Sequence, residues 1–229
     1  MKRRPTPELL DTDSGTAEEV AETLRDLQSF NGRLGGVSTT RDLIHTVARR
    51  TSRNNFSLLE IAAGTGFVPM QASQALSRQG VNLDITLLDR APTHLPQNGT
   101  CRKIAADAMS MPFSDSVFDL VSCSLFLHHL SPEEAVQFAR ESLRVCRVTV
   151  LVNDLVRHPL HLALAYAGVP IYRSRITRND APASVKQAYT IDEMTEFFRT
   201  GSAAQVEAHR HFLFRMGVIA WKSHPQQSY

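Results

Sequence analysis

Residues 1–55 carry the apolar spacing of two helices. A capping box occupies residues 16–19, and apolar residues then recur at every third or fourth position as far as residue 30. We expect this helix to end at the glycines within residues 32–36. A second apolar stripe of the same period spans residues 41–49. Both helices precede any segment with the pattern of a strand, so we expect them to lie outside the sheet.

From Phe56 onward, short apolar runs alternate with helical segments. Residues 56–61 have the composition of a buried strand, and four further strands are expected at residues 83–88, 102–105 (a short one), 118–123 and 148–152. One helix is expected from the glycine turn after the first run to about Ser77. Another follows the capping box that begins at Ser131 and extends to about Val145. Strands that alternate with helices of this length predict a parallel sheet with helices on both faces.

The last third of the chain has a different pattern. Residues 155–172 are apolar and predict a helix, while residues 173–188 are polar and contain Pro182. A capping box at Thr190 opens another helix, which Gly201 ends. Two near-adjacent strands follow, at residues 205–209 and 211–221, and they can pair antiparallel at one edge of the sheet.

Together these elements predict one α/β domain with a doubly wound, mainly parallel, seven-stranded sheet. We expect an N-terminal helical lid over residues 1–55, a core over 56–152, a helical lid insertion over 153–190, and a last helix with two edge strands over 191–222. The length of 229 residues suits a single domain. Hydrophobic (42%) and charged (21%) fractions are ordinary, which excludes a disordered or coiled-coil protein.

Charge and cysteine content exclude further classes of protein. A formal net charge of +2 is too small to indicate a nucleic-acid binder. The three cysteines are far apart and form no CxxC pair, which argues for a reducing compartment and against a disulfide framework or a zinc site. The most apolar run, residues 162–171, is about half a membrane span, and no apolar stretch follows the basic residues 2–4. We therefore expect a cytoplasmic protein with no membrane span.

One stretch of the chain is unusually basic. Residues 140–178 contain seven arginines and only two acidic residues, Glu141 and Asp154. The stretch is either a set of solvated helix faces or a basic wall that faces an anionic or electron-rich ligand.

A glycine motif, Glu60-Ile61-Ala62-Ala63-Gly64-Thr65-Gly66, ends the first predicted strand. Gly64 and Gly66 permit a positive φ and let the backbone approach a ligand closely. A doubly wound sheet binds its ligands at the carboxyl ends of the strands. The loop is therefore either the ligand site or a tight strand-to-helix turn without a ligand.

An acidic residue ends the neighbouring strand. Asp89 can accept hydrogen bonds from both hydroxyls of a ribose, as the acid of a nicotinamide-binding fold also does. Pro69, however, stands where a dinucleotide fingerprint has glycine or alanine, and it crowds the helix start that a pyrophosphate faces. The pattern therefore favours a ligand with a ribose and no phosphate over a nicotinamide cofactor.

Two further elements complete a recognisable set. Asp107 follows the third strand, and the segment Ser122-Cys123-Ser124-Leu125-Phe126-Leu127-His128-His129-Leu130 ends and follows the fourth. In this order and spacing, residues 56–152 resemble the class I S-adenosylmethionine-dependent methyltransferases, in particular the small-molecule branch with ubiquinone/menaquinone-type and type 11 enzymes. The resemblance implies that S-adenosylmethionine is the cofactor and that its methyl group is transferred to a small acceptor.

The resemblance also assigns cofactor-binding roles. Four residues match the loop that binds the methionine part: Glu60, Ala62, Gly64 and Gly66. Asp89 matches the acid that binds the ribose, and Arg90 beside it would flank the adenosine. Asp107 matches the acid that binds the adenine amino group, with Ala108 next to it. Ser124 and Leu125 match the segment near the methionine end. Two features depart from the family pattern, because Ala62 replaces the usual first glycine and no Pro-Gly-Gly turn precedes the fifth strand.

Polar residues after the fourth and fifth strands are candidates for the acceptor site. His128 and Asp154 are the candidate catalytic residues, and histidine is the better base near neutral pH. Each has a structural alternative, since His128 can pack its loop and Asp154 can cap a helix. Asn153 and Arg157 are candidate substrate contacts. Adjacent histidines in an extended segment point in opposite directions, so we expect no metal at His128 and His129.

The acceptor is expected to be small and aromatic, quinone-like or polyketide-like. Residues 155–166 add more apolar surface than a short crossover needs, and ligand pockets combine apolar walls with a few placed polar groups. Two alternatives stay open: a domain that binds the cofactor without turnover and, less favoured, a nicotinamide-dependent oxidoreductase. The sequence does not choose between a monomer and a dimer.

Overall fold

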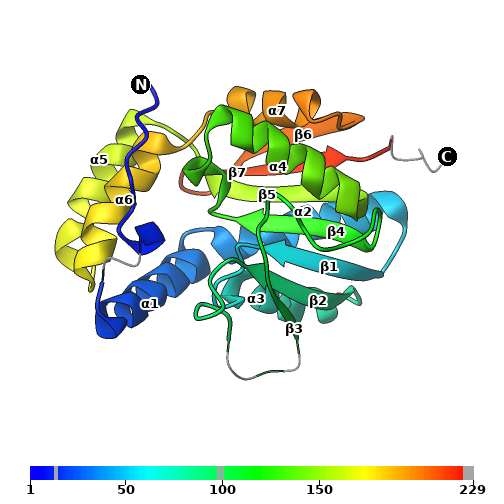
Figure 1. The fold of residues 1–229 in the computed structure, drawn as a ribbon, viewed down its shortest axis with the longest axis horizontal. Coiled ribbons are helices and arrows are strands. Elements are labelled where there is room, and N and C mark those ends of the chain that lie inside the picture. The colour runs from blue at the N-terminus through cyan, green and yellow to red at the C-terminus, as the bar shows by residue number, and fades with distance from the viewer. Residues whose placement is uncertain (13–14, 97–98, 100, 224–229) are drawn as a thin grey trace.

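A computed structural model describes residues 1–12, 15–96, 99 and 101–223 of the chain. Its centre is one seven-stranded sheet with the order β3-β2-β1-β4-β5-β7-β6 (Figure 1). The strands are β1 (Asn55–Ile61), β2 (Asn82–Asp89), β3 (Arg102–Ala105), β4 (Phe118–Ser124), β5 (Cys146–Leu155), β6 (Gln205–His211) and β7 (Arg215–Trp221). Strands β1 to β5 run parallel, and β7 is antiparallel to its neighbours β5 and β6. The predicted seven-stranded, mainly parallel sheet is confirmed.

Helices cover both faces of this sheet, because successive residues of the central strands bury apolar side chains on opposite sides. Leu58 of β1 belongs to the buried cluster that contains Leu43. The next residue, Leu59, belongs to the cluster that contains Phe138 and Phe198. The covering helices are α2 (Gly36–Thr51) and α3 (Phe67–Ser77) on one face, and α4 (Pro132–Val145) and α7 (Ile191–Thr200) on the other.

A third group of helices lies at one end of the sheet, on the left of Figure 1. It consists of α1 (Ala17–Arg33), α5 (Pro159–Ala167) and α6 (Arg175–Gln187), with the short turns η1 (Leu10–Thr12) and η3 (Val169–Ile171). Thr23 of α1 donates to Ser174 Oγ at 2.8 Å, and Asp26 accepts a hydrogen bond from the Arg173 backbone N–H at 2.9 Å. Arg4 donates its backbone N–H to the Lys186 carbonyl of α6 at 3.0 Å. The N-terminal segment, α1 and α6 are thus tied to one another.

Three helices begin where capping boxes predict them. Thr16, Ser131 and Thr190 each accept a hydrogen bond from the backbone of a glutamate three residues later, and that glutamate bonds back to the capping residue. These reciprocal bonds satisfy backbone donors that have no partner within the helix. They fix the starts of α1, α4 and α7.

Strand β5 is longer than the sequence pattern predicts. It extends to Leu155 because β7 pairs with its last residues. In this pairing Asn153 lies opposite Gly217 and Asp154 opposite Met216. The expectation that Asn153 and Asp154 follow the strand is therefore wrong, since both lie inside the sheet. The partner strand β7 begins at Arg215 and is shorter than expected, because the strand before it, β6, extends to His211.

Two helix boundaries also differ from the sequence pattern. Gly35, expected to end the first helix, instead caps the start of α2 with a left-handed φ of 88°. The apolar stretch 155–172 is not one helix, because α5 ends at Ala167 and the separate turn η3 follows it. Among the described residues, no helix is long and apolar enough to cross a membrane.

Candidate functional site

A large cavity lies between the sheet and the group of helices α1, α5 and α6. Its volume is about 1330 Å³. One wall is formed by the residues that end or follow β1, β2, β3 and β4, and the opposite wall by α1, α5 and α6. This is the edge at which a doubly wound sheet binds its ligands.

The loop after β1 is tied directly to the end of β2. Asp89 Oδ2 accepts a hydrogen bond from the Gly64 backbone N–H at 2.8 Å, and Asp89 Oδ1 accepts one from the Ala91 N–H at 2.9 Å. Ala63 donates its own N–H to the Leu88 carbonyl at 3.0 Å. The glycine loop and the acid therefore form one rigid wall of the cavity.

Glycine is required at the two loop positions 64 and 66 for different physical reasons. Gly64 has a φ of 50°, and a Cβ built there meets no atom within 4 Å, so its backbone borders open space. Gly66 has a φ of 70°, and a Cβ there lies 2.7 Å from Leu87 Cδ1. Gly64 thus presents bare backbone to the cavity, while Gly66 lets the start of α3 pack closely on β2.

Glu60, near the end of β1, is a buried acid whose hydrogen-bond partners in the described part of the chain are hydroxyl groups. Its side chain is 1% exposed, and its carboxylate accepts a short hydrogen bond from the Ser122 hydroxyl of β4. Burial raises the pKa of Glu60 to about 7, although the hydroxyl partly opposes this. A positive ligand group beside this carboxylate would favour its charged form.

The other predicted cofactor residues line the same wall. Asp107 is exposed and accepts a hydrogen bond from the Met109 N–H at 2.8 Å. Leu125 has a φ of 55°, and its N–H bonds to the Asn153 carbonyl at 2.9 Å. The cavity is bordered by nine of the ten residues that the resemblance assigned to the cofactor: Glu60, Ala62, Gly64, Asp89, Arg90, Asp107, Ala108, Ser124 and Leu125. The tenth, Gly66, lies behind them.

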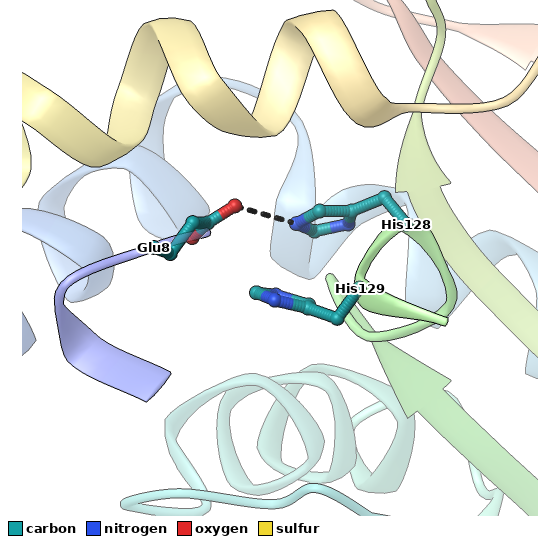
Figure 2. Close-up of side chains that lie close together, drawn as sticks. All are labelled: Glu8, His128 and His129. Atoms are coloured by element: carbon teal, nitrogen blue, oxygen red, sulfur yellow. Dashed lines mark ion pairs between the residues drawn. The ribbon is translucent and has the colours of Figure 1, made fainter. Parts of the chain in front are cut away.

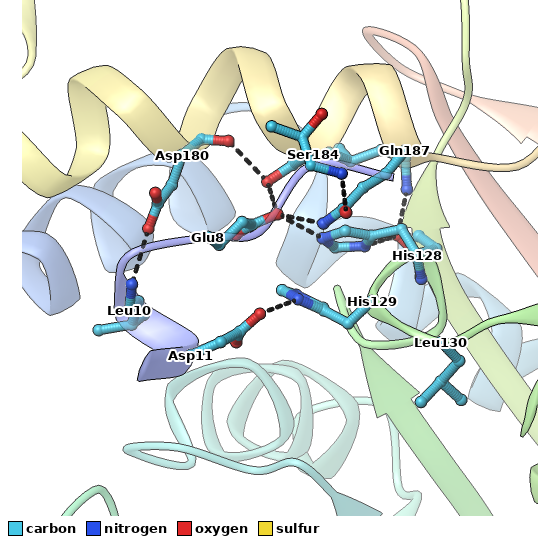
Figure 3. Close-up of polar contacts among 12 residues, drawn as sticks. Glu8, Leu10, Asp11, His128, His129, Leu130, Asp180, Ser184 and Gln187 are labelled. Carbon is cyan, nitrogen blue, oxygen red and sulfur yellow. Dashed lines mark hydrogen bonds and ion pairs between the residues drawn. The ribbon is translucent and has the colours of Figure 1, made fainter. Parts of the chain in front are cut away.

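His128 stands at another corner of the cavity, in the short turn η2 (Leu127–His129) after β4. Its Nδ1 lies 2.7 Å from Asp154 Oδ1, and its Nε2 lies 3.6 Å from Glu8 Oε1 (Figure 3). Burial opposes a charged imidazole, but Asp154 and Glu8 outweigh it and raise the pKa of His128 to about 10. In the same way His128 overcomes burial and lowers the pKa of Asp154. At neutral pH this histidine therefore keeps its proton.

Asn153 and Arg157 do not border the cavity. The Asn153 amide donates to the Gly36 carbonyl at 2.7 Å, and Arg157 pairs with Glu193 at 2.9 Å. Asp154 is fully buried behind His128. Strand β5 thus places Asn153 and Asp154 inside the protein. Of the four predicted acceptor-site residues, His128 alone borders the cavity.

Two residues of the cavity had no signal in the sequence pattern. Glu8 follows a proline-rich segment and reaches the cavity only because residues 1–12 lie along α6. Arg215 begins β7, is 3% exposed and donates to Asn31 Oδ1 at 2.8 Å. Burial lowers the pKa of Arg215 to about 10. Both positions depend on contacts between distant parts of the chain.

Comparisons with known proteins agree with this geometry. Residues 59–151 match the family model described as a methyltransferase domain, type 11. None of the curated proteins matches the chain by sequence.

Solved structures share the fold at low sequence identity. The plantazolicin methyltransferase BpumL, in complex with S-adenosylhomocysteine, is 11% identical with a TM-score of 0.67, over 95% of each chain. A methyltransferase from Methanosarcina mazei, described as S-adenosylmethionine-dependent, is 17% identical with a TM-score of 0.54, over 77% of this chain and 97% of its own.

A longer relative is also similar in fold. A structure from Anabaena variabilis is 17% identical with a TM-score of 0.53 and covers 74% of this chain, which spans only 64% of that relative's length. Residues 59–151 thus match a methyltransferase domain, and the chain shares the fold of solved methyltransferases.

Proposed function

We propose that the protein transfers the methyl group of S-adenosylmethionine to a small acceptor, with the cofactor lying along the wall formed by the ends of β1, β2 and β4. The hydrogen bond between Asp89 and Gly64 carries this proposal. It joins the two parts of the resemblance, the glycine loop and the ribose acid, on one side of one cavity.

The residues of this wall fit the cofactor. Each Asp89 oxygen accepts one backbone hydrogen bond and keeps lone pairs for ribose hydroxyls. Gly64 leaves open space where the methionine part would approach the backbone. Glu60 places a carboxyl group at the same end, where the positive charges of S-adenosylmethionine would offset the cost of its burial. Asp107 and Ala108 border the same cavity and would lie on the adenine side of the bound cofactor.

The size of the cavity supports a second ligand. Its volume of about 1330 Å³ exceeds the roughly 300–1,000 Å³ of a typical single-ligand pocket. The cofactor supplies an electrophilic methyl group, and the chain's task is to hold the acceptor in line with it. Positioning of this kind is worth about 7–11 kcal/mol of the barrier.

The helical wall supports an apolar, aromatic or polyketide-like acceptor. Leu24 and Leu27 of α1 and Leu164 of α5 border the cavity. Arg173 is the one arginine of the basic stretch 140–178 that borders it, which suits an acceptor with an oxygen anion. His128 is the proposed contact to the reacting end of the acceptor, with Asp154 as the residue that positions its ring.

A screen with labelled methyl donor tests the proposal. The purified chain is incubated with labelled S-adenosylmethionine and a panel of phenols, quinone precursors and polyketide-like acids. We expect label in at least one acceptor and about 10- to 300-fold weaker cofactor binding by Asp89→Ala. Binding of S-adenosylhomocysteine without label in any acceptor would support the alternative of a domain without turnover. Binding of NAD instead would support the oxidoreductase.

A further inference from the structure

Two histidines and one glutamate converge beside the acceptor end of the cavity. Glu8, His128 and His129 each offer a ligand atom, and these atoms lie within 4.8 Å of one another (Figure 2). The histidines do not diverge as an extended segment would require, because η2 is a tight 3-10 turn. Their rings lie on the same side with centroids 4.1 Å apart. The expectation of oppositely directed side chains is therefore wrong.

We propose that Glu8, His128 and His129 form a binding site for one divalent transition-metal ion. Two imidazoles and one carboxylate are a ligand set that suits zinc and its neighbours, with a fourth position open to solvent or substrate. With bonds of about 2.0–2.1 Å, two ligand atoms of a tetrahedral zinc lie about 3.4 Å apart. His128 Nε2 and Glu8 Oε1 lie 3.6 Å apart, which is too long for a hydrogen bond and close to this spacing.

Both imidazoles are oriented in the manner of metal ligands. Asp11 holds His129 Nδ1 at 2.7 Å (Figure 3). Asp154 holds His128 Nδ1 at the same distance. Each histidine therefore keeps its Nε2 for another partner. A carboxylate on the far nitrogen fixes the ring and strengthens it as a ligand, which is the usual outer shell of a metal-bound histidine.

The glutamate is held in place as well. Ser184 and Gln187 of α6 both donate hydrogen bonds to Glu8 Oε1, at 2.6 and 2.7 Å. Glu8 is 6% exposed, and its position depends on the N-terminal segment that lies along α6. These bonds orient the carboxylate toward His128 (Figure 3).

The charge of the cluster also suits a cation. Three carboxylates, from Glu8, Asp11 and Asp154, contact two imidazoles. Metal-bound histidines are neutral, so the three carboxylates would place three negative charges around the ion. A divalent ion offsets most of that charge.

Zinc titration of the full chain tests the site. The protein is freed of metal with a chelator, dialysed, and titrated with ZnCl₂ by calorimetry at mildly alkaline pH. We expect one saturable equivalent in the wild type and loss of that equivalent in Glu8→Gln and His129→Gln. Asp154→Asn, which removes the outer-shell carboxylate, should weaken binding about 10- to 100-fold. The matched control is His209→Gln, an exposed histidine of β6, which should bind like the wild type.

The same variants separate this proposal from the proposed function. Binding of S-adenosylhomocysteine by each variant reports a folded cofactor wall and does not depend on the metal. Absence of a zinc equivalent in the wild type would overturn the metal site and leave the methyl transfer standing. Wild-type zinc affinity in Glu8→Gln and His129→Gln would also overturn it, as would an equal loss in His209→Gln. If Glu8→Gln fails to fold, the half-buried His129→Gln decides.

Discussion

The two walls of the cavity are built in opposite ways. The cofactor wall, at the ends of β1, β2 and β4, joins neighbouring strand ends. Its central hydrogen bond links Gly64 and Asp89, which are 25 residues apart. The acceptor wall, formed by α1, α5 and α6, joins distant segments, since the bonded residues Asp26 and Arg173 are 147 residues apart. A strand end fixes its own loop, whereas the acceptor wall exists only after the whole chain has folded. The first wall is therefore the part that a sequence motif can describe.

Buried acids in two parts of the site differ in their partners. Burial raises the pKa of Glu60, near the end of β1, to about 7. Beside the turn after β4, His128 outweighs burial and lowers the pKa values of Glu8 and Asp154. The histidine thus balances its two neighbouring acids, while Glu60 is left to be balanced by a ligand.

Replacing Glu60 should have the largest effect on stability. Its pKa is near 4.5 in the unfolded chain and about 7 in the folded protein, so the folded state holds a proton that the unfolded state has released. The stabilising effect of this proton is fully present below about pH 4.5 and lost as pH rises to about 7. The difference corresponds to about 3 kcal/mol of unfolding free energy.

Urea unfolding of Glu60→Gln and the wild type over that pH range measures this effect. The unfolding free energy of the variant, relative to that of the wild type, should rise by up to about 3 kcal/mol from acid to mildly alkaline pH. Glu196→Gln, an exposed glutamate of α7, is the control and should follow the wild type. If the difference in unfolding free energy between Glu60→Gln and the wild type is the same at every pH, Glu60 is ionised throughout. The contrast between Glu60 and the acids beside His128 would then be wrong.

Removal of the ribose acid should act on affinity. Asp89→Ala loses one or two charge-assisted hydrogen bonds to the cofactor, so we expect S-adenosylhomocysteine to bind about 10- to 300-fold more weakly by calorimetry. Asp84→Ala is the matched control, because Asp84 lies on the same strand but is exposed at its other end. Wild-type affinity in Asp89→Ala would show that Asp89 only holds the glycine loop in place and does not bind the cofactor.

The smallest expected effect concerns the helical wall. Asp26 accepts hydrogen bonds from the backbone N–H groups of Arg173 and Ser174, at 2.9 and 3.4 Å. Asp26→Ala should speed amide hydrogen exchange at the start of α6 about 5- to 10-fold, while the β1–β4 amides keep their rates. Arg25→Ala, an exposed neighbour on α1, should change neither. Equal acceleration in the sheet would mean that the two walls open together.

Strand positions and the cofactor wall follow from local sequence. Residues 102–105 form the edge strand β3 as predicted. The bounds of β1, β2 and β4 differ from prediction by one or two residues, because the buried parts of these strands are short apolar runs. Nine predicted cofactor residues share the cavity for the same reason, since parallel strands end at one edge.

The acceptor wall does not follow from local sequence. The length of β5 depends on pairing with β7, so the inward placement of Asn153 had no local signal. Glu8 enters the cavity through contacts with α6, at residues about 175 to 180 positions away in the chain. No period or spacing in the sequence encodes contacts of that kind.

Calorimetry of the purified chain with S-adenosylhomocysteine and, separately, with NAD shows which cofactor the ends of β1, β2 and β4 bind. We expect one equivalent of S-adenosylhomocysteine to bind in the micromolar range and NAD to give no heat. Heat with NAD and none with S-adenosylhomocysteine would mean that these strand ends do not bind S-adenosylmethionine.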